Sequence, residues 1–521
     1  MKPFSRHLVG PPSPQNRSPL LVVAVSLLAL SGSAGAQTNG GTTLPMRSCT
    51  SLSSLTNFQF SVVEAHMEPL SEGAPEHCRV YGRILPDIRF AVYLPSDWNG
   101  RLSMLGNGGW AGSIPEGGMR SALRDGSVSV GTDTGHDSRR EPGGSFMLNR
   151  QKLIDYASRS VHLTVEAAKQ ITIAYYPSPI RYSYFVGCST GGRQALTEAQ
   201  RFPADFDGIL VGAPILDYVG TNLSRAWEAR IMERAAIGVE QLEILSAAVY
   251  EKCDGSDGLE DGVIENPPAC GFDPATDLPV CDDASAGANC FTQDQIDALK
   301  KVYDGPPFFP GRVVGGEVFV EGRNGRFSGW QRVINPDVGR FAEPFFKYMA
   351  FEVPDSASDW RTFDFVEDLP KVEWLRRIID ATDPDLRRFR EHGGKMLMFF
   401  GWADPPLNPL RGVRYYEAVL DEMGPSTTDF FRLFMIPGMF HCGSGVGVNR
   451  FEYEGDPRAW HQTDYLEAWV EEGVAPEQLL GLRVDQDSVL WTRPICLYPR
   501  VARYTGRGDS NDAANFVCVE G

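Results

Sequence analysis

One short motif has the spacing of a nucleophile elbow, in which a strained turn between a strand and a helix exposes a serine: Gly187-Cys188-Ser189-Thr190-Gly191. The run before it, 182–187, predicts a strand, and 193–201 is compatible with a helix. Ser189 is therefore the candidate nucleophile. The backbone N–H of Thr190 is the candidate oxyanion donor at the helix N-terminus. Taken alone, the five residues fit an ordinary glycine-rich turn equally well.

A serine nucleophile needs an acid and a base, which follow an elbow in the order serine, acid, histidine. Asp404 stands just after the predicted strand 396–400, in a loop stiffened by two prolines. His441 stands just after the predicted strand 431–436. These positions favour an acyl transfer in which Ser189 attacks, His441 moves the proton and Asp404 orients the ring. The alternatives are a turn residue for Asp404 and a surface-loop histidine for His441.

Ten cysteines form an even set, as expected when all of them pair in an oxidising compartment. Spacing favours four local pairs, which are Cys49 with Cys78, Cys253 with Cys270, Cys281 with Cys290 and Cys496 with Cys518. Cys188 and Cys442 remain, one directly before Ser189 and the other directly after His441. A bond between them would hold their Cα atoms about 4.4 to 6.8 Å apart and bring the serine close to the histidine. For any one cysteine, the alternative is a buried free thiol.

Residues 1–36 predict an export signal. Three cations, Lys2, Arg6 and Arg17, precede the apolar run 20–30, and the small residues 34–36 offer a cleavage site. A membrane anchor is the alternative, but this run is shorter than the ~20 residues that cross a bilayer, and no later stretch is long enough. We expect a secreted or periplasmic protein that starts at Gln37, with no membrane association.

The composition excludes several classes of protein. Of 521 residues, 42% are hydrophobic and 22% are charged, which indicates a globular chain rather than a disordered one. The net charge is −18, so no basic field exists to attract phosphate backbones or anionic lipid, and no nucleic-acid partner is expected. The sequence makes no prediction of the oligomeric state.

From about residue 80, short apolar runs alternate with helical patterns, which predicts an α/β core with a mainly parallel sheet. One long amphipathic helix is predicted at 153–174. The predicted strands cover 90–94, 102–105, 128–131, 182–187, 208–212, 396–400 and 431–436. The alternation fails between 217 and 394, where a helical pattern at 224–251 is followed by a stretch rich in Cys, Asp, Gly and Pro. We expect a catalytic domain formed by 37–216 and 395–521, with an inserted domain at 217–394.

The joined arrangement of Cys188-Ser189, Asp404 and His441-Cys442 resembles the tannase/feruloyl esterase family. The resemblance runs over nearly the whole mature chain, including the local cysteine pairs and the insertion. It implies an α/β-hydrolase core with a lid domain, and a small ester of a hydroxycinnamic, gallic or related aromatic acid as the substrate. The family also includes mono(2-hydroxyethyl) terephthalate hydrolase, so that ester is an alternative.

A second oxyanion donor is expected from the loop after the strand 102–105. The segment 106–110 has the sequence Gly-Asn-Gly-Gly-Trp and matches the glycine-rich segment of the family. Gly109 is the preferred donor and Gly108 the near alternative. The register stays open because the run of the family often has another glycine at the position of Asn107.

Three aspartates separated by glycines lie at 254–261, next to Cys253. Hard oxygen ligands in a flexible loop suit Ca²⁺ better than zinc, and the spacing is not that of an EF-hand. The resemblance implies a structural Ca²⁺ bound by the side chains of Asp254, Asp257 and Asp261 and by the carbonyls of Leu259 and Val263. A solvated acidic turn is the alternative.

Substrate recognition is expected from aromatic and polar residues at 305–360. An arginine there could pair with a free carboxylate, which the terephthalate half-ester carries and ferulate esters lack, although most such arginines are ordinary surface charges. The candidates are Trp330, Arg312, Arg323, Arg326 and Arg332. Two other hypotheses are a calcium-stabilised extracellular binding protein with an inactive hydrolase core, and metal-assisted hydrolysis at the aspartates.

Overall fold

The structure is a computed structural model that describes residues 43–71, 73–281, 287, 289–322, 325–331, 341–454, 456–458, 462–486 and 488–521. These residues all belong to one unit, Thr42–Gly521. The predicted signal segment 1–36 lies outside the described residues, so its removal stays a prediction. Among the described helices, none has the length and apolar character that a bilayer crossing requires.

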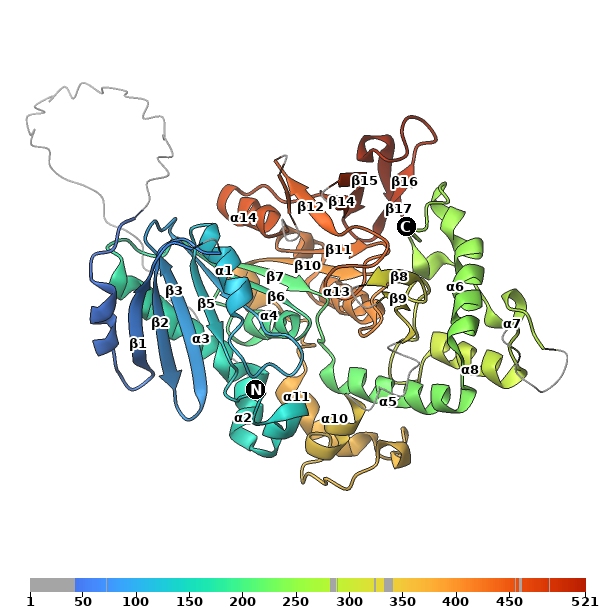
Figure 1. The fold of residues 1–521 in the computed structure, drawn as a ribbon, viewed down its shortest axis with the longest axis horizontal. Coiled ribbons are helices and arrows are strands. Elements are labelled where there is room, and N and C mark those ends of the chain that lie inside the picture. Colours follow the sequence, from blue (N-terminus) through green and yellow to red (C-terminus); the bar gives the residue numbers. More distant parts are fainter. Residues whose placement is uncertain are drawn as a thin grey trace, which may run out of the picture. The chain divides into compact units, whose positions relative to one another are not determined.

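The centre of the unit is a nine-stranded sheet with the order β1-β2-β3-β5-β4-β6-β7-β10-β11 (Figure 1). The first four strands in this order pair antiparallel, and the sheet is parallel from β5 onward. The strands are β1 Ser61–Glu68, β2 His77–Ile84, β3 Ile88–Pro95, β4 Arg101–Leu105, β5 Val128–Thr132, β6 Tyr182–Cys188, β7 Gly208–Gly212, β10 Lys395–Gly401 and β11 Phe431–Ile436. All seven predicted strands are confirmed, whereas β1 and β2 were not predicted.

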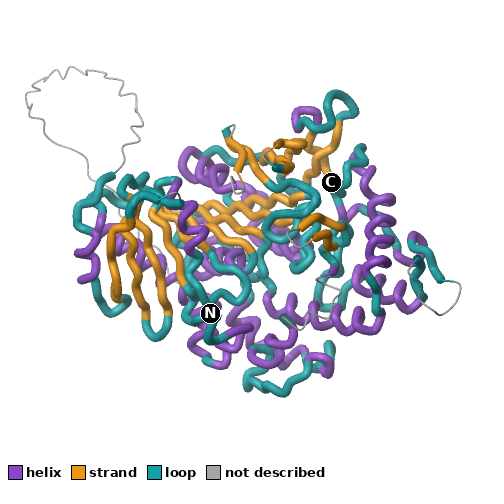
Figure 2. Tube along the Cα trace, viewed as in Figure 1, coloured by secondary structure: helices purple, strands orange, loops and turns teal. Residues whose placement is uncertain are grey.

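Helices cover both faces of this sheet (Figure 2). Successive residues of β10 pack into different hydrophobic clusters. Met398 belongs to the cluster that includes residues of α3 Ser160–Tyr175 and α4 Thr190–Arg201, and Phe399 belongs to the cluster that includes residues of α14 Gln462–Glu472. The helices outside the insertion are α1 Glu116–Arg124, α2 Arg150–Ile154, α3 Ser160–Tyr175, α4 Thr190–Arg201, α13 Pro409–Met423 and α14 Gln462–Glu472. The predicted helix 153–174 is confirmed, but a π-helical turn, η3 Asp155–Arg159, joins α2 to α3.

The insertion follows β7 and ends before β10, which pairs directly with β7. Its helices and strands are α5 Tyr218–Ala235, α6 Val239–Cys253, α7 Pro274–Asp277, α8 Gln293–Asp304, β8 Phe319–Gly322, β9 Gly325–Ser328, α10 Ala342–Tyr348, α11 Glu373–Ile379 and α12 Arg387–Glu391. Residues of α5, α6 and α8 share a hydrophobic cluster of their own, and Figure 1 shows these helices grouped together. Residues of α10, α11 and α12 instead join the main core. The boundaries 217 and 394, and the role of the segment as a lid, stay predictions.

The chain ends in two small antiparallel sheets that the sequence patterns did not predict. The first has the order β13-β12-β14-β15 and the second pairs β16 with β17. Their strands are β12 Arg450–Tyr453, β13 Asp456–Arg458, β14 Gln478–Asp485, β15 Ser488–Cys496, β16 Arg500–Tyr504 and β17 Phe516–Glu520. Arg493 of β15 forms an ion pair of 2.6 Å with Asp261, so this region supports the acidic loop of the insertion.

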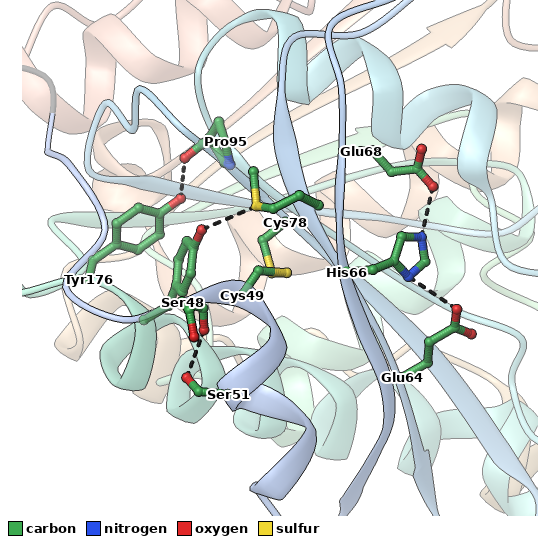
Figure 3. Close-up of a disulfide and its surroundings, with 11 residues drawn as sticks. Ser48, Cys49, Ser51, Glu64, His66, Glu68, Cys78, Pro95 and Tyr176 are labelled. Atoms are coloured by element: carbon green, nitrogen blue, oxygen red, sulfur yellow. Dashed lines mark hydrogen bonds and ion pairs between the residues drawn. A yellow bond between two sulfur atoms is a disulfide. The ribbon is translucent and has the colours of Figure 1, made fainter.

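All ten cysteines are paired: four disulfides are the local pairs that the spacing favoured, and the fifth joins the two remaining cysteines, Cys188 and Cys442. Figure 3 shows the bond between Cys49 and Cys78, which ties the short helix η1 Cys49–Ser54 to β2. Close to it, the hydroxyl of Tyr176 donates to the carbonyl of Pro95 at 2.5 Å. The long-range bond between Cys188 and Cys442 spans 254 positions and has a Cα separation of 6.1 Å.

Candidate active site

Ser189 lies on a sharp turn between β6 and α4, with φ 63° and ψ −118°. A positive φ is costly for a residue with a side chain and persists only where the surroundings hold it. Here the Ser189 N–H donates to the carbonyl of Gly212 at 2.9 Å, and its own carbonyl accepts from the N–H groups of Arg193 and Ile215 at 3.1 and 3.2 Å. The strand β7 and the first turn of α4 therefore fix the backbone of the candidate nucleophile.

The two glycines of the motif are required by close packing. A Cβ on Gly187 would lie 2.5 Å from the backbone of Gly191, and one on Gly191 would lie 3.1 Å from the Cα of Gly106. The end of β6, the start of α4 and the loop after β4 thus meet with no room for a side chain. This is the tight strand-to-helix turn that the spacing predicted.

Asp404 and His441 stand just past the ends of β10 and β11, which are neighbours in the sheet. His441 Nδ1 lies 2.7 Å from Asp404 Oδ2, and the other carboxylate oxygen accepts the N–H of Leu407 at 2.9 Å. The Asp404 side chain is fully buried, whereas that of His441 is 26% exposed. The carboxylate therefore fixes the imidazole through Nδ1, which leaves Nε2 to face a reacting group.

The disulfide of Cys188 and Cys442 joins the residue before Ser189 to the residue after His441. The sheet order places β6, β7, β10 and β11 side by side and parallel, so the loops after them emerge at one edge. The bond then fixes two of these loops to each other. The three predicted triad residues are brought to the same edge of the sheet in this way.

Gly109 lies in the loop between β4 and α1, with φ +54°. Its carbonyl accepts hydrogen bonds from the Thr190 hydroxyl at 2.6 Å and from the Tyr156 hydroxyl at 3.0 Å. The loop is also tied to α4 by Asn107, whose N–H and side-chain carbonyl both bond to the amide of Gln194, at 2.9 and 3.0 Å. The predicted oxyanion segment thus lies against the first turn of α4. Sequence reasoning missed Tyr156 and Gln194, because their role depends on contacts with a distant loop.

Next to Gly109, three aromatic rings pack together. The ring centroid of Trp110 lies 6.4 Å from that of Tyr218 in α5 and 5.9 Å from that of Phe341, just before α10. Sequence reasoning missed this group, although a tryptophan directly after the glycine run was a usable signal.

Comparison with known proteins identifies the family. Residues 73–519 match the family described as "Tannase and feruloyl esterase". The chain belongs to this family. Mono(2-hydroxyethyl) terephthalate hydrolase of Piscinibacter sakaiensis is 32% identical over 522 residues, which cover 85% of this chain and 85% of that protein. Feruloyl esterase B of Aspergillus niger is 31% identical over 455 residues, which cover 82% and 83%.

Solved structures agree with this assignment. The crystal structure of feruloyl esterase B from Aspergillus oryzae matches with a TM-score of 0.79 at 27% identity, over 90% of this chain and 99% of that one. A tannin acyl hydrolase from Aspergillus niger shares the fold, with a TM-score of 0.65 at 21% identity. The chain is therefore a carboxylic ester hydrolase with an α/β-hydrolase core, as the resemblance implied.

In this esterase, most of the residues predicted to bind the substrate contact other protein groups instead. Arg312 pairs with Glu228 at 2.8 Å and donates to the carbonyl of Pro405 at 2.6 Å. Trp330 is 1% exposed and packs against Tyr303, so its ring belongs to the core of the insertion. Arg326 forms an exposed ion pair with Glu243. Arg323 and Arg332 lie outside the described residues.

Arg225 of α5 was not predicted, although it lies close to the triad. Its guanidinium donates to the carbonyl of Pro406 at 2.8 Å and lies 4.7 Å from the ring centre of Phe341. Among the described residues, no carboxylate forms an ion pair with it. Burial, and then the charge of Arg312, lower the pKa of Arg225 to about 10. An anion bound beside this side chain would therefore be strongly stabilised.

The aspartates of the predicted calcium loop turn their carboxylates toward backbone N–H groups. Asp254 accepts from Gly262 at 2.9 Å, and Asp257 accepts from Leu259 at 3.0 Å. Burial, and then the charges of Asp261 and Asp254, raise the pKa of Asp257 to about 6. Hard oxygen donors that are crowded together and partly buried suit a divalent cation. The carboxylate oxygens of the three aspartates do not all lie within 4.8 Å of one another, so binding would have to draw them closer.

Of the residues that the structure describes, one group of three does have metal-binding side-chain atoms within 4.8 Å of one another, namely His162, Glu198 and Asp205. His162 pairs with Asp205 at 2.7 Å, and this hydrogen bond raises the pKa of the histidine. Burial raises the pKa of Glu198 well above its ordinary range. His162 and Asp205 already satisfy each other through this hydrogen bond, and Glu198 is buried beside them.

Proposed function

We propose that this esterase is a secreted serine hydrolase that cleaves esters of aromatic carboxylic acids through an acyl-enzyme. The observation that carries the proposal is the disulfide of Cys188 and Cys442, with its Cα separation of 6.1 Å. It joins the turn of Ser189 to the loop of His441, whose imidazole is held by the buried Asp404 at 2.7 Å.

In the proposed mechanism, Ser189 Oγ attacks the ester carbonyl while His441 Nε2 takes its proton. Asp404 stabilises the imidazolium that results. The N–H groups of Thr190 and Gly109 stabilise the negative charge on the former carbonyl oxygen. His441 then gives its proton to the leaving alcohol, and an acyl-Ser189 remains. A water molecule, deprotonated by the same imidazole, attacks this acyl group and releases the acid.

The group formed by Trp110, Tyr218 and Phe341 supports an aromatic acyl group. Trp110 and Phe341 are half-buried and can offer an apolar surface to a flat substrate, whereas the buried Tyr218 packs against Trp110. Trp110 follows Gly109 directly, so this surface adjoins the predicted oxyanion site. Relatives named feruloyl esterase point to the same substrate class.

A second candidate substrate is the terephthalate half-ester, and Arg225 favours it. This guanidinium lies beside the loop of Asp404 and has no ion pair with a described carboxylate. A free carboxylate on the substrate would supply its counter-charge. Initial rates on methyl ferulate, methyl gallate, chlorogenate and mono(2-hydroxyethyl) terephthalate separate the candidates. If the half-ester is the substrate, Arg225→Gln raises KM for it by about 10-fold or more and leaves methyl ferulate unchanged.

Replacement of the nucleophile tests the mechanism. Ser189→Ala should abolish activity on aryl esters, whereas Ser129→Ala, which alters a fully buried serine of β5 away from the turn, should keep it. A folded Ser189→Ala enzyme with full activity would contradict the mechanism. It would leave metal-assisted hydrolysis at the aspartates as the alternative. That alternative requires the chemistry to stop when calcium is removed from a folded enzyme.

We further propose that the loop 254–263 binds a structural Ca²⁺ through Asp254, Asp257 and Asp261 and the carbonyls of Leu259 and Val263. Three aspartate carboxylates within eight residues, two of them half-buried, support this proposal, because hard oxygen donors are what Ca²⁺ prefers. Export is supported by five disulfides, which persist in oxidising compartments. N-terminal sequencing of the mature protein should start at Gln37.

A further inference from the structure

We infer that Tyr156 is a positioning residue for the oxyanion loop, acting from a π-helical turn that Arg193 stabilises. The inference rests on the proposed role of Gly109 as an oxyanion donor. It is carried by a chain of contacts that runs from the helix carrying the nucleophile, through the π turn, to the carbonyl of Gly109.

Tyr156 lies at an irregular turn within a long helix. Helical structure runs from Arg150 to Tyr175, but Asp155–Arg159 forms a π turn within it. A π turn disturbs the regular i to i−4 ladder, and such turns are frequent at functional sites. Tyr156 lies inside the turn and is 1% exposed.

Arg193 supplies donors to the π turn. Its side chain is fully buried and donates to the carbonyl of Ala157 at 2.8 Å and to that of Tyr156 at 3.0 Å. The guanidinium also lies 4.9 Å from the ring centre of Tyr156. Arg193 belongs to the first turn of α4, and its own N–H donates to the carbonyl of Ser189. The π turn is thereby attached to the helix that carries the nucleophile.

Tyr156 completes the chain at the oxyanion loop. Its hydroxyl donates to the Gly109 carbonyl at 3.0 Å, and the Thr190 hydroxyl donates to the same oxygen at 2.6 Å. A Cβ built on Gly109 would meet no atom within 4 Å apart from its chain neighbours, so no side chain packs against that side of the residue. Two hydroxyl groups from different elements bind its carbonyl and help to fix where it lies. An oxyanion donor must be held within about 0.5 Å of its working position.

The test removes each hydroxyl without changing the shape of the side chain. Tyr156→Phe and Thr190→Val should each lower kcat about 3- to 10-fold, because one hydrogen bond to Gly109 remains. Together they should lower kcat about 100-fold, which is the loss expected when one oxyanion donor is removed. KM for a methyl ester should stay within about 2-fold, because the bound substrate carries little charge on its carbonyl oxygen.

Two matched controls remove hydroxyls of the same kind at other places. Tyr176→Phe deletes a buried phenol that also donates to a backbone carbonyl, that of Pro95 (Figure 3). Thr197→Val deletes a buried hydroxyl in α4 that donates to the carbonyl of Arg193 at 2.9 Å. Both controls should keep kcat within about 2-fold of the native enzyme, while their thermal midpoints fall as much as those of the test variants.

A boronic acid inhibitor gives a readout that a purely structural role would not change. It adds to the nucleophile and places an oxygen in the oxyanion site, so its affinity should fall in parallel with kcat in the test variants and stay constant in the controls. The inference is overturned if the double variant keeps native kcat, or if KM rises while kcat is unchanged. Either result leaves the proposed function intact as long as Ser189→Ala is inactive, so the two failures are distinguishable.

Discussion

Removal of the disulfide between Cys188 and Cys442 should affect both stability and catalysis, and a second disulfide separates the two effects. In the chain-entropy model, a bond that closes 254 positions contributes about 5.5 kcal/mol to the free energy of unfolding. The bond between Cys281 and Cys290 closes only 9 positions and contributes about 2.5 kcal/mol. The variant Cys188→Ala/Cys442→Ala should therefore lose about 3 kcal/mol more than Cys281→Ala/Cys290→Ala.

The loss of catalytic activity should differ between the two variants much more than the loss of stability does. Without the bond, the turn of Ser189 and the loop of His441 are held together only by their own packing. A displacement of about 1 Å between reacting groups lowers the rate about 100-fold. We expect kcat/KM on an aryl ester to fall by about this factor in the first variant and to stay near native in the second.

The assay pairs initial rates with urea unfolding followed by circular dichroism, and rates are measured only where each variant is fully folded. Native activity in folded Cys188→Ala/Cys442→Ala would refute the positioning role of the bond. Equal loss of activity in both variants would also refute it, because general loosening would then be the cause.

Three other predictions follow from buried groups. Asp404→Asn should lower kcat by about 10⁴-fold, because the amide favours the wrong tautomer of His441. The far-ultraviolet circular dichroism spectrum should change little. A loss of kcat under about 10-fold would contradict the role of Asp404 in orienting the imidazole. Burial raises the pKa of Glu317 from 4.5 to about 7, so the folded state keeps a proton that the unfolded chain releases. The free energy of unfolding should therefore fall by about 3 kcal/mol between pH 4.5 and 7, and Glu317→Gln should lack this decline in urea titrations. Chelation of calcium should lower the thermal midpoint of the native enzyme but leave the thermal midpoint of Asp257→Asn unchanged. The folded, calcium-free enzyme should stay active. Equal melting curves of the native enzyme with and without calcium would exclude the site.

The central strands were predictable because parallel strands are buried on both faces and read as continuous apolar runs. All five residues of β7, for example, are buried, and the strand reads Gly-Ile-Leu-Val-Gly. In β1, a register shift between Val62 and Glu64 breaks the alternation of apolar and polar residues, and Val63 is exposed. The strand therefore has neither of the patterns that single-sequence reasoning recognises.

Part of the site was predictable for a related reason. Ser189, Asp404 and His441 each follow a recognisable strand, and the two cysteines left over after local pairing adjoin two of them. The residues that support the site are set by tertiary contacts. Tyr156 lies in a helix whose apolar pattern continues across the π turn, and its partner Gly109 is 47 positions away.

The residues predicted to bind the substrate also could not be identified from the sequence alone, because their partners are set by tertiary contacts. Arg312 was a candidate partner for a substrate carboxylate, but Glu228, 84 positions earlier, already pairs with it. Arg225 has no pattern that distinguishes it in the sequence. Its proposed importance comes from its place beside Pro406, in the loop of Asp404, the candidate catalytic acid.

The most direct test of the account is to locate the nucleophile chemically. The native enzyme is treated with a fluorophosphonate, digested and analysed by mass spectrometry. We predict one phosphonylated residue, Ser189, and loss of labelling in Asp404→Asn, which lacks an oriented base. An adduct on another residue, or no adduct on an enzyme that still hydrolyses aryl esters, would contradict the proposed serine mechanism.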